Sequence, residues 1–190
     1  MRPISLFTFF LFLFLLTSCL RTKTEFWPSG NKKSEIRMKG DLYDGPAKYF
    51  YENEVLQMEC NYKENKLDGK LVRYFNNGRK EEERFYHDGL ITGLKRIWDR
   101  SGSMISEAHY KMGKFHGSYH GFYPDQTLRI KGDYVNGKLE GRWLYYDELG
   151  NIKQITFFKN NLKEGWEVIY TPEGGIFAKC NYLNGAARVP

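Results

Sequence analysis

The sequence has few of the residues from which enzymes usually build an active site. It contains four histidines and three cysteines in 190 residues. No G-x-S-x-G segment is present to hold a nucleophilic serine. No glycine-rich phosphate-binding loop, of either the G-x-G-x-x-G or the Walker type, follows a strand and opens a helix. We therefore predict that the protein is not an enzyme and takes no cofactor.

The histidines and carboxylates are also poorly placed for metal binding or acid–base catalysis. His116 and His120 are four residues apart, which in a strand puts them on one face but about 13 Å apart. Zinc needs nitrogen and sulfur ligands at close quarters, and neither Cys60 nor Cys180 is near these histidines in the sequence. The run Glu81–Glu83 alternates between the two faces of a strand and so forms no acid–base pair. We predict neither a metal site nor a catalytic site.

The charge is not concentrated enough for a nucleic-acid-binding protein. Basic and acidic residues are interspersed, apart from short blocks such as residues 79–84, and no dense basic stripe is present. The net charge of +6 becomes +5 if residues 1–18, which contain one arginine, are removed. This mild positive balance fits an anionic membrane surface. Solvated sheet faces explain it equally well and are the simpler interpretation.

The one long apolar run lies at the N-terminus. It extends from Ile4 to Leu16, about the length of a signal-peptide core and too short for an ordinary membrane span. The segment that follows, Leu16-Thr17-Ser18-Cys19, resembles the lipobox of bacterial lipoproteins, whose cysteine is acylated and becomes the mature N-terminus. This resemblance implies a signal peptide over residues 1–18, lipid attachment at Cys19 and a tether over residues 19–25. The alternatives are an uncleaved anchor and an ordinary signal peptide in which Cys19 is incidental.

Residues 26–190 form a repeat domain with a period of 24 residues. The clearest copy is DGKLVRYFNNGRKEEERFYHDGLI, residues 68–91. Its opening glycine recurs without insertion at Gly45, Gly69, Gly93, Gly117, Gly141 and Gly165. An unbroken period of this length indicates units that pack on their neighbours. A degenerate half-repeat covers residues 26–41, and six repeats run from about residue 44 to residue 187.

Two positions of the repeat are aromatic in nearly every copy. The first aromatic column holds Phe26, Phe50, Tyr74, Trp98, Phe122, Tyr146 and Tyr170. The second aromatic column holds Met38, Tyr62, Tyr86, Tyr110, Tyr134, Phe158 and Tyr182. We expect both columns to line one face of the structure and to form its core rather than a platform for a ligand.

Two further positions mark turns. The first turn column holds Gly30, Glu54, Gly78, Gly102, Gln126, Gly150 and Gly174. The second holds Asp41, Asn65, Gly89, Gly113, Gly137, Asn161 and Gly185. Where the second column lacks glycine it has Asn or Asp, the residues that best tolerate a positive φ. This column therefore predicts a left-handed backbone.

The predicted fold is all-β. Asn-Gly and Asp-Gly turns between short aromatic-rich runs are typical of β-hairpins, and a turn residue every dozen positions leaves no room for helices. We expect an elongated single-layer antiparallel β-meander of 24-residue hairpin repeats, with about thirteen strands, and the sheet should be twisted or curled.

The repeat also separates the two remaining cysteines. Cys60 and Cys180 occupy the same position five repeats apart. With two strands per repeat they should lie on the order of 50 Å apart, whereas a disulfide requires Cα atoms within about 7 Å. We predict two buried free thiols.

The pattern resembles the MORN repeat in its bacterial variant. The closest copy is EGRWLYYDELG at residues 140–150, preceded by YVNGKL at residues 134–139. The resemblance covers roughly residues 41–187, with departures at Glu54, Asp99 and Gln126; the last implies a different turn. It implies a curved single sheet used for binding or scaffolding, with no catalytic motif. Some bacterial relatives are called antitoxin-like, and other MORN proteins are linked to membranes and protein partners.

These features predict a membrane-anchored lipoprotein that binds a protein or an envelope component through its repeat surface. Leu20 after Cys19 is not an acidic retention signal, which favours the outer membrane. Two alternatives stay open: an antitoxin or immunity-like protein that neutralises a specific toxin, and an envelope protein that self-associates through its open sheet edges.

Overall fold

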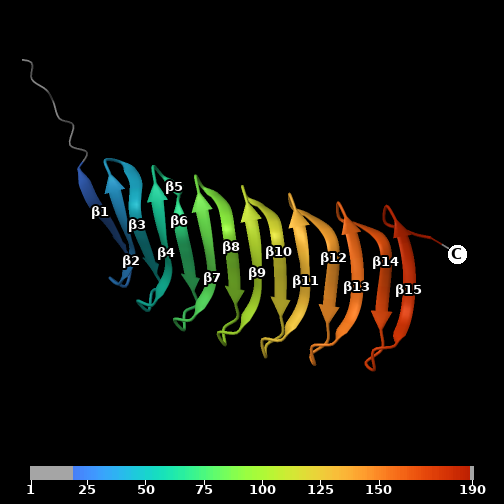
Figure 1. Cartoon of the computed structure of the whole chain (residues 1–190). Helices are drawn as coiled ribbons and strands as arrows, with labels where there is room; N and C mark the ends of the chain where they lie inside the picture. The colour runs from blue at the N-terminus through green and yellow to red at the C-terminus, as the bar shows by residue number, and fades with distance from the viewer. Residues whose placement is uncertain (1–18, 189–190) are drawn as a thin grey trace, which may run out of the picture.

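The chain forms one open antiparallel sheet whose strands follow each other in chain order (Figure 1). This computed structural model describes residues 19–188. The strands are β1 (Leu20–Phe26), β2 (Lys32–Lys39), β3 (Leu42–Phe50), β4 (Leu56–Lys63), β5 (Lys66–Leu67), β6 (Gly69–Tyr74), β7 (Lys80–His87), β8 (Leu90–Trp98), β9 (Met104–Lys111), β10 (Lys114–Phe122), β11 (Leu128–Val135), β12 (Lys138–Tyr146), β13 (Ile152–Lys159), β14 (Leu162–Tyr170), β15 (Ile176–Leu183) and β16 (Ala186–Arg188). The predicted single-layer β-meander is confirmed.

The sheet has sixteen strands rather than about thirteen. One extra strand, β1, arises because residues predicted as a tether pair with β2, from Leu20 opposite Lys39 to Phe26 opposite Lys32. A second, β16, pairs with the last residues of β15. The third is a division, because Asp68 separates β5 from β6. The predicted signal peptide, residues 1–18, lies outside the described residues.

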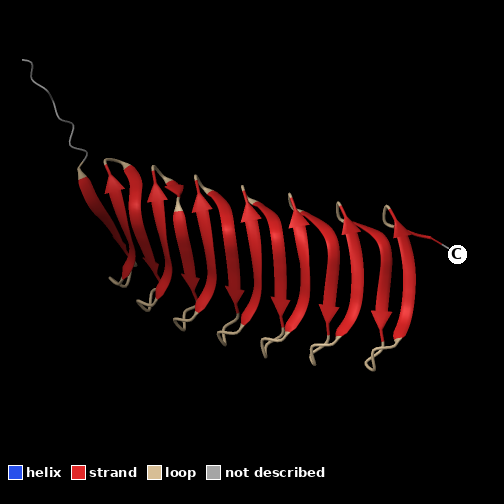
Figure 2. Ribbon diagram, viewed as in Figure 1, coloured by secondary structure: helices blue, strands red, loops and turns tan. Residues whose placement is uncertain are grey.

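The hairpins are closed along two opposite rims of the sheet (Figure 2). We call one the tight-turn rim; it consists of residues 39–42, 63–66, 87–90, 111–114, 135–138, 159–162 and 183–186. From Glu64–Asn65 to Asn184–Gly185, both central residues of each turn have a positive φ. This is the type I′ geometry that matches the twist of a hairpin. The left-handed prediction is thus confirmed for the second turn column except at Asp41, where Gly40 carries the positive φ of 61° instead.

We call the opposite edge the long-loop rim; it consists of residues 27–31, 51–55, 75–79, 99–103, 123–127, 147–151 and 171–175. In each loop the first amide donates to the fifth carbonyl, and the fourth amide donates to the first carbonyl. Glu54 and Gln126 keep this geometry with φ values of 66° and 73°. The prediction of a different turn at Gln126 is therefore wrong, because the backbone hydrogen bonds hold a non-glycine residue in the left-handed region.

The two aromatic columns lie on opposite faces of the sheet, which contradicts the expectation of one shared face. Tyr62 and Tyr86, of the second column, pack on the buried hydrophobic cluster. Tyr74, of the first column, instead donates to Glu59 at 2.7 Å on the other side. A register shift follows the fourth residue after the opening glycine, as between Arg73 and Tyr74 after Gly69. Each shift adds one residue to one strand of the pair, and the spacing in the sequence alone does not reveal it.

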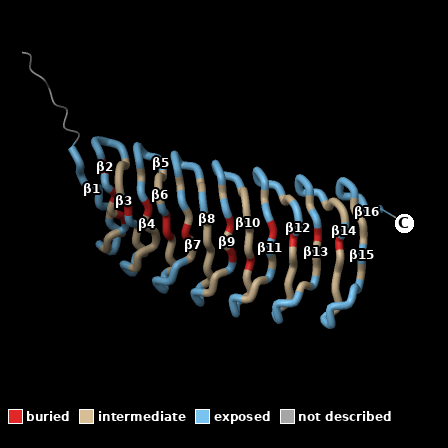
Figure 3. Tube along the Cα trace, viewed as in Figure 1, coloured by how far each residue is buried: buried red, intermediate tan, exposed pale blue. Residues whose placement is uncertain are grey.

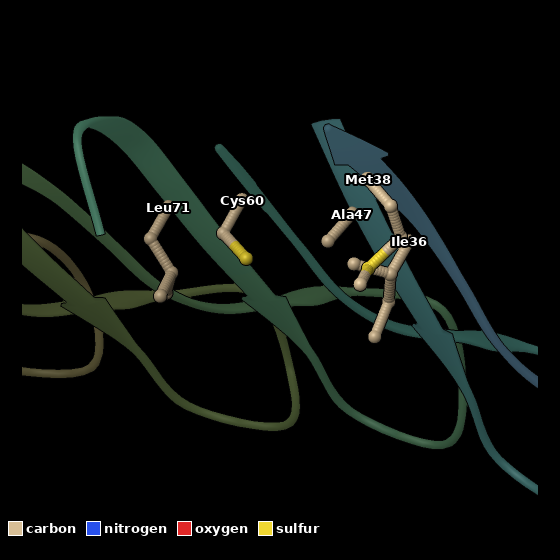
Figure 4. Packing of buried hydrophobic residues seen from close by; sticks show 5 residues of the cluster. All are labelled: Ile36, Met38, Ala47, Cys60 and Leu71. Atoms are coloured by element: carbon tan, nitrogen blue, oxygen red, sulfur yellow. The ribbon is translucent and has the colours of Figure 1, made fainter. Parts of the chain in front are cut away.

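We call the side that carries the second column the inner face, and the other side the outer face. The inner face holds seven of the eight buried hydrophobic residues, namely Ile36, Met38, Ala47, Cys60, Leu71, Ala108 and Trp143. They form a band across the middle of the strands (Figure 3). A single-layer sheet has no second layer to cover them, so burial requires that the sheet bends over this face. Figure 4 shows five members of the band side by side.

The band is a cross-strand row, which we call the inner row. Ala47 stands opposite both Ile36 and Cys60, and Trp143 stands opposite Thr156. The row mixes small residues, such as Ala47 and Cys60, with large ones, such as Leu71 and Trp143. Gly132 is the smallest member, and the indole of Trp143 lies so close over it that a Cβ atom there would overlap the ring. This glycine is required by packing, since its φ is not positive.

We predict that Gly132→Ala destabilises the protein by about 1–3 kcal/mol, the usual cost of overpacking a filled core. Chemical denaturation measures the loss. Trp143→Leu in the same chain should recover part of it, because the smaller side chain frees the space. If Gly132→Ala costs as much stability in a Trp143→Leu background as in the wild type, this packing is contradicted.

Replacing a strained loop residue should have the opposite effect. Glu54 occupies the left-handed region that costs an L-residue about 1–2 kcal/mol, while glycine adds about 0.5–1 kcal/mol of unfolded-state entropy. We therefore expect Glu54→Gly to raise the free energy of unfolding by about 0.5–1 kcal/mol. Glu52→Gly in the same loop, where φ is not positive, is the matched control and should lower it. A loss of stability in Glu54→Gly would refute the argument.

Candidate functional site

Cys19, the predicted lipid-attachment residue, lies at the tight-turn rim. It is exposed, and its carbonyl accepts a hydrogen bond from the Gly40 amide at 3.3 Å. It directly precedes β1, whose first residue, Leu20, stands opposite Lys39 of this rim. Any group attached to Cys19 therefore lies at this rim and not at the middle of either face.

The tight-turn rim is basic. Seven exposed lysines lie on it: Lys39, Lys63, Lys66, Lys111, Lys114, Lys138 and Lys159. Only Asp41, Glu64 and Asp88 oppose them, so the rim has a net charge of +4. Two of these carboxylates form ion pairs. Asp41 pairs with Arg21 at 3.0 Å, and Asp88 pairs with Lys66 at 3.7 Å.

The same rim exposes aliphatic side chains between its lysines. Six large apolar residues on it are at least 42% exposed: Leu42, Leu90, Met112, Val135, Leu162 and Leu183. Met112, at the tip of a turn, is 71% exposed and stands between Lys111 and Lys114. Apolar side chains with a surrounding lysine belt are typical of protein surfaces that lie in a lipid headgroup region.

The long-loop rim has the opposite character. Its acidic residues are Glu52, Glu54, Asp99, Asp125, Asp147, Glu148 and Glu173, and its basic residues are Arg79 and Arg100, a net charge of −5. Within residues 19–188, Leu149 is the one large apolar residue of this rim that is as exposed as the six apolar residues of the tight-turn rim. Several of these carboxylates are used locally. The Asp99 carboxylate accepts from the Ser101 hydroxyl at 2.6 Å, a bond that lowers the pKa of the carboxyl.

Sequence analysis missed this polarity because opposite charges alternate along the chain. Successive turns belong to opposite rims, so the basic and acidic turns are interspersed in sequence and separated in space. A signal was present in the repeat. Lysine recurs immediately before the tight turns at Lys39, Lys63, Lys111 and Lys159, and immediately after them at Lys66, Lys114 and Lys138.

The histidines do not converge. His109 lies 3.0 Å from the Ser118 hydroxyl, His120 lies 3.3 Å from Glu107, and His87 lies 3.3 Å from Asp68. Within residues 19–188, no group of three or more His, Cys, Asp or Glu residues is arranged to hold a metal ion.

The glutamate run divides between the two faces but does not alternate strictly, because the register shift opposite Arg73 puts Glu81 on the same face as Glu82. On the outer face, Glu83 accepts from Lys70 at 2.9 Å and from Lys80 at 3.2 Å. Burial alone would raise the pKa of Glu83, but these two ammonium groups outweigh it and lower the pKa. On the inner face, Glu82 accepts from Lys95 at 2.8 Å and lies 3.3 Å from Arg84.

Both repeat-domain cysteines are free, as predicted. Cys60 is buried in the inner row, and this burial raises the pKa of its thiol to about 11. The prediction that Cys180 is also buried is wrong. It is only half-buried, because β16 covers no more of β15 than residues Asn181–Leu183.

The inner face carries a continuous aromatic stack over β9–β13. Ring centres lie 4.4 Å apart for Tyr110–Phe115, 4.8 Å for Phe115–Tyr134 and 5.1 Å for Tyr134–Trp143. Each such pair contributes about 0.5–1.5 kcal/mol beyond the burial of its area. The second aromatic column is thus part of the core, as expected, while its ring edges stay half-exposed on a bent surface.

Comparison with known families agrees with this architecture. The family model described as a MORN repeat variant matches two stretches, residues 43–64 and 139–160. Each stretch is one hairpin closed by a long loop, β3–β4 and β12–β13, and the two begin at the same position of the 24-residue repeat. No curated protein matches the chain. The period, the turn geometry and these two matches together make the chain similar to MORN repeat proteins.

Proposed function

We propose that the protein is an exported, non-catalytic lipoprotein that is acylated at Cys19 and rests on an anionic membrane through its tight-turn rim. The sheet then stands away from the bilayer and presents its faces to a protein or envelope component. The observation that carries this proposal is that Cys19 lies at the tight-turn rim, which is basic and exposes apolar side chains. No helix among residues 19–188 is long and apolar enough to cross a membrane.

The energetics favour two membrane signals acting together. The acyl chains on Cys19 would hold the protein on a membrane, and the basic rim would add a second, electrostatic attraction to anionic lipids. Each lysine near an anionic surface adds about 1 kcal/mol. The acidic long-loop rim would be repelled by the same surface, so the charge distribution also selects which rim faces the lipid.

This orientation leaves both faces of the sheet accessible. Strands of eight or nine residues would extend about 30 Å from the bilayer. The bent inner face, with its half-exposed aromatic stack, is the surface best suited to a protein partner, since aromatic residues are enriched at the centres of interfaces.

Removing rim lysines should weaken membrane binding. We expect Lys111→Gln/Lys114→Gln, in unacylated residues 19–190 with Cys19→Ser, to reduce binding to vesicles containing an anionic phospholipid by about fivefold per lysine. Sedimentation with vesicles measures this, and added salt should reduce the wild-type binding as well. The matched control is Lys131→Gln/Lys153→Gln, which removes two exposed lysines that lie away from the tight-turn rim and should bind like the parent. Equal losses in both pairs would refute a specific rim.

The anchor and the partner can be tested together in native envelopes. We expect Cys19→Ser in the full chain to abolish acylation, seen as a missing lipid mass, and to change fractionation with the membrane. Cross-linking and affinity capture with the wild type should then yield a partner in near-equal amount. Self-cross-links alone would instead support a structural protein, and a single toxin-like partner would support the neutralising alternative. An unprocessed wild type that carries no lipid would overturn the lipoprotein proposal.

A further inference from the structure

The inner row contains one gap that the protein does not fill. Two small residues, Ala108 and Gly132, interrupt the row between large ones. The gap at Gly132 is closed by the indole of Trp143. The gap at Ala108 stays open as a cavity of about 170 Å³, which we call the Ala108 pocket; it is lined by Lys95, Ile97, Ser106, Ala108, Tyr110, Phe115 and Tyr119.

The size and the walls of the pocket suit one apolar side chain. Apolar cavities of about 150 Å³ in proteins are known to bind a ring the size of benzene. Here Ile97, Tyr110, Phe115 and Tyr119 supply apolar walls, and Ala108 itself is 5% exposed and forms part of the buried row. The pocket is too small for a drug-sized or cofactor-sized ligand, which needs about 300 Å³ or more.

One wall of the pocket carries an excess of positive charge. Lys95 and Arg84 occupy neighbouring positions of the inner row on β8 and β7, and both pair with the same oxygen of Glu82, at 2.8 Å and 3.3 Å. Two cations therefore share one carboxylate. Arg84 also has a buried Nε–H without a hydrogen-bond partner. The nearby inner-face pair Arg73 and Glu81, 3.5 Å apart, is neutral as a unit.

These cations are unusual for their place. Elsewhere the inner row is apolar at residues such as Leu71 and Trp143, and its buried carboxylate, Glu167, is paired with Lys163 at 2.7 Å. Partly burying an under-paired cation is costly. An ammonium group has three donors, and Lys95 uses one of them on Glu82. An apolar ligand with an anionic end would fill the cavity and accept hydrogen bonds from the free donors of Lys95.

We propose that the Ala108 pocket binds the C-terminal residue of a polypeptide, with the apolar side chain in the cavity and the carboxylate on Lys95. A C-terminal residue is the place in a protein where an apolar side chain and a carboxylate share one carbon atom. Arg84, one strand further, provides the second positive charge. This proposal deepens the proposed function, because it takes the inner face as the protein-binding face, but it does not depend on the membrane anchor.

The test uses the protein purified from native envelopes, in detergent micelles, and three fluorescent peptides read by polarisation. The peptides share a Gly-Ser spacer and end in Phe with a free carboxylate, in Phe with an amide, or in Gly with a free carboxylate. We expect the Phe carboxylate peptide to bind about tenfold or more tightly than each of the others, because a charge-assisted hydrogen bond and an apolar side chain are each worth that much.

Two variants separate the charge from the cavity. Lys95→Met should remove the preference for carboxylate over amide, and Ala108→Leu should fill the cavity and weaken both Phe peptides about tenfold or more. Lys131→Met, on the outer face, is the matched control and should bind like the wild type. Thermal unfolding of each variant verifies that the sheet is intact.

Equal binding of acid and amide peptides by the wild type, or wild-type affinity in Ala108→Leu, would overturn the proposal. Failure of the membrane proposal has a different signature, since it would change fractionation and vesicle binding while leaving this peptide preference in place.

Discussion

A sheet of one layer has nothing to pack against except itself, and this constraint governs the rest of the molecule. Side chains such as Leu71 and Trp143, each 2% exposed, can be buried only if neighbouring strands hold them in one row and the sheet bends over that row. The row in turn requires that every strand enters in the same register. A single slipped residue would move an entire strand of apolar side chains to the wrong face.

The two kinds of turn maintain this register. Six of the seven tight turns fix their hairpin through two left-handed residues, and the five-residue loops repeat the same two backbone hydrogen bonds in all seven copies. Because backbone geometry does this work, the side chains on the rims can differ without disturbing the fold. The two rims carry opposite charge, +4 on the tight-turn rim and −5 on the long-loop rim. The inner row is less free, and the under-paired cations at Arg84 and Lys95 and the gap at Ala108 stand out in it for that reason.

Much of this architecture could be predicted from the sequence, and the failures have a common cause. Glycine, asparagine and aspartate report directly on backbone geometry, so the period, the hairpins and the left-handed turns were predictable except at Asp41. The face or rim on which a residue lies depends instead on which residues pair across neighbouring strands. The unseen register shift after residues such as Arg73 placed Tyr74 on the opposite face from Tyr86. The alternation of turns between rims likewise hid the lysine edge, and nothing in the sequence marks Ala108 as a gap rather than a filled position.

The orientation of the sheet on a bilayer tests the central claim most directly, and neutron reflectometry on a supported anionic bilayer measures it as the thickness of the bound protein layer. A sheet that stands on its tight-turn rim should give a layer of about 30 Å, the length of its strands, whereas a sheet lying on one face should give about 10 Å. A layer near 30 Å with the acidic rim in the solvent is the result the account predicts. A layer near 10 Å would contradict it, because the lysine rim could then not be the surface that meets the lipid.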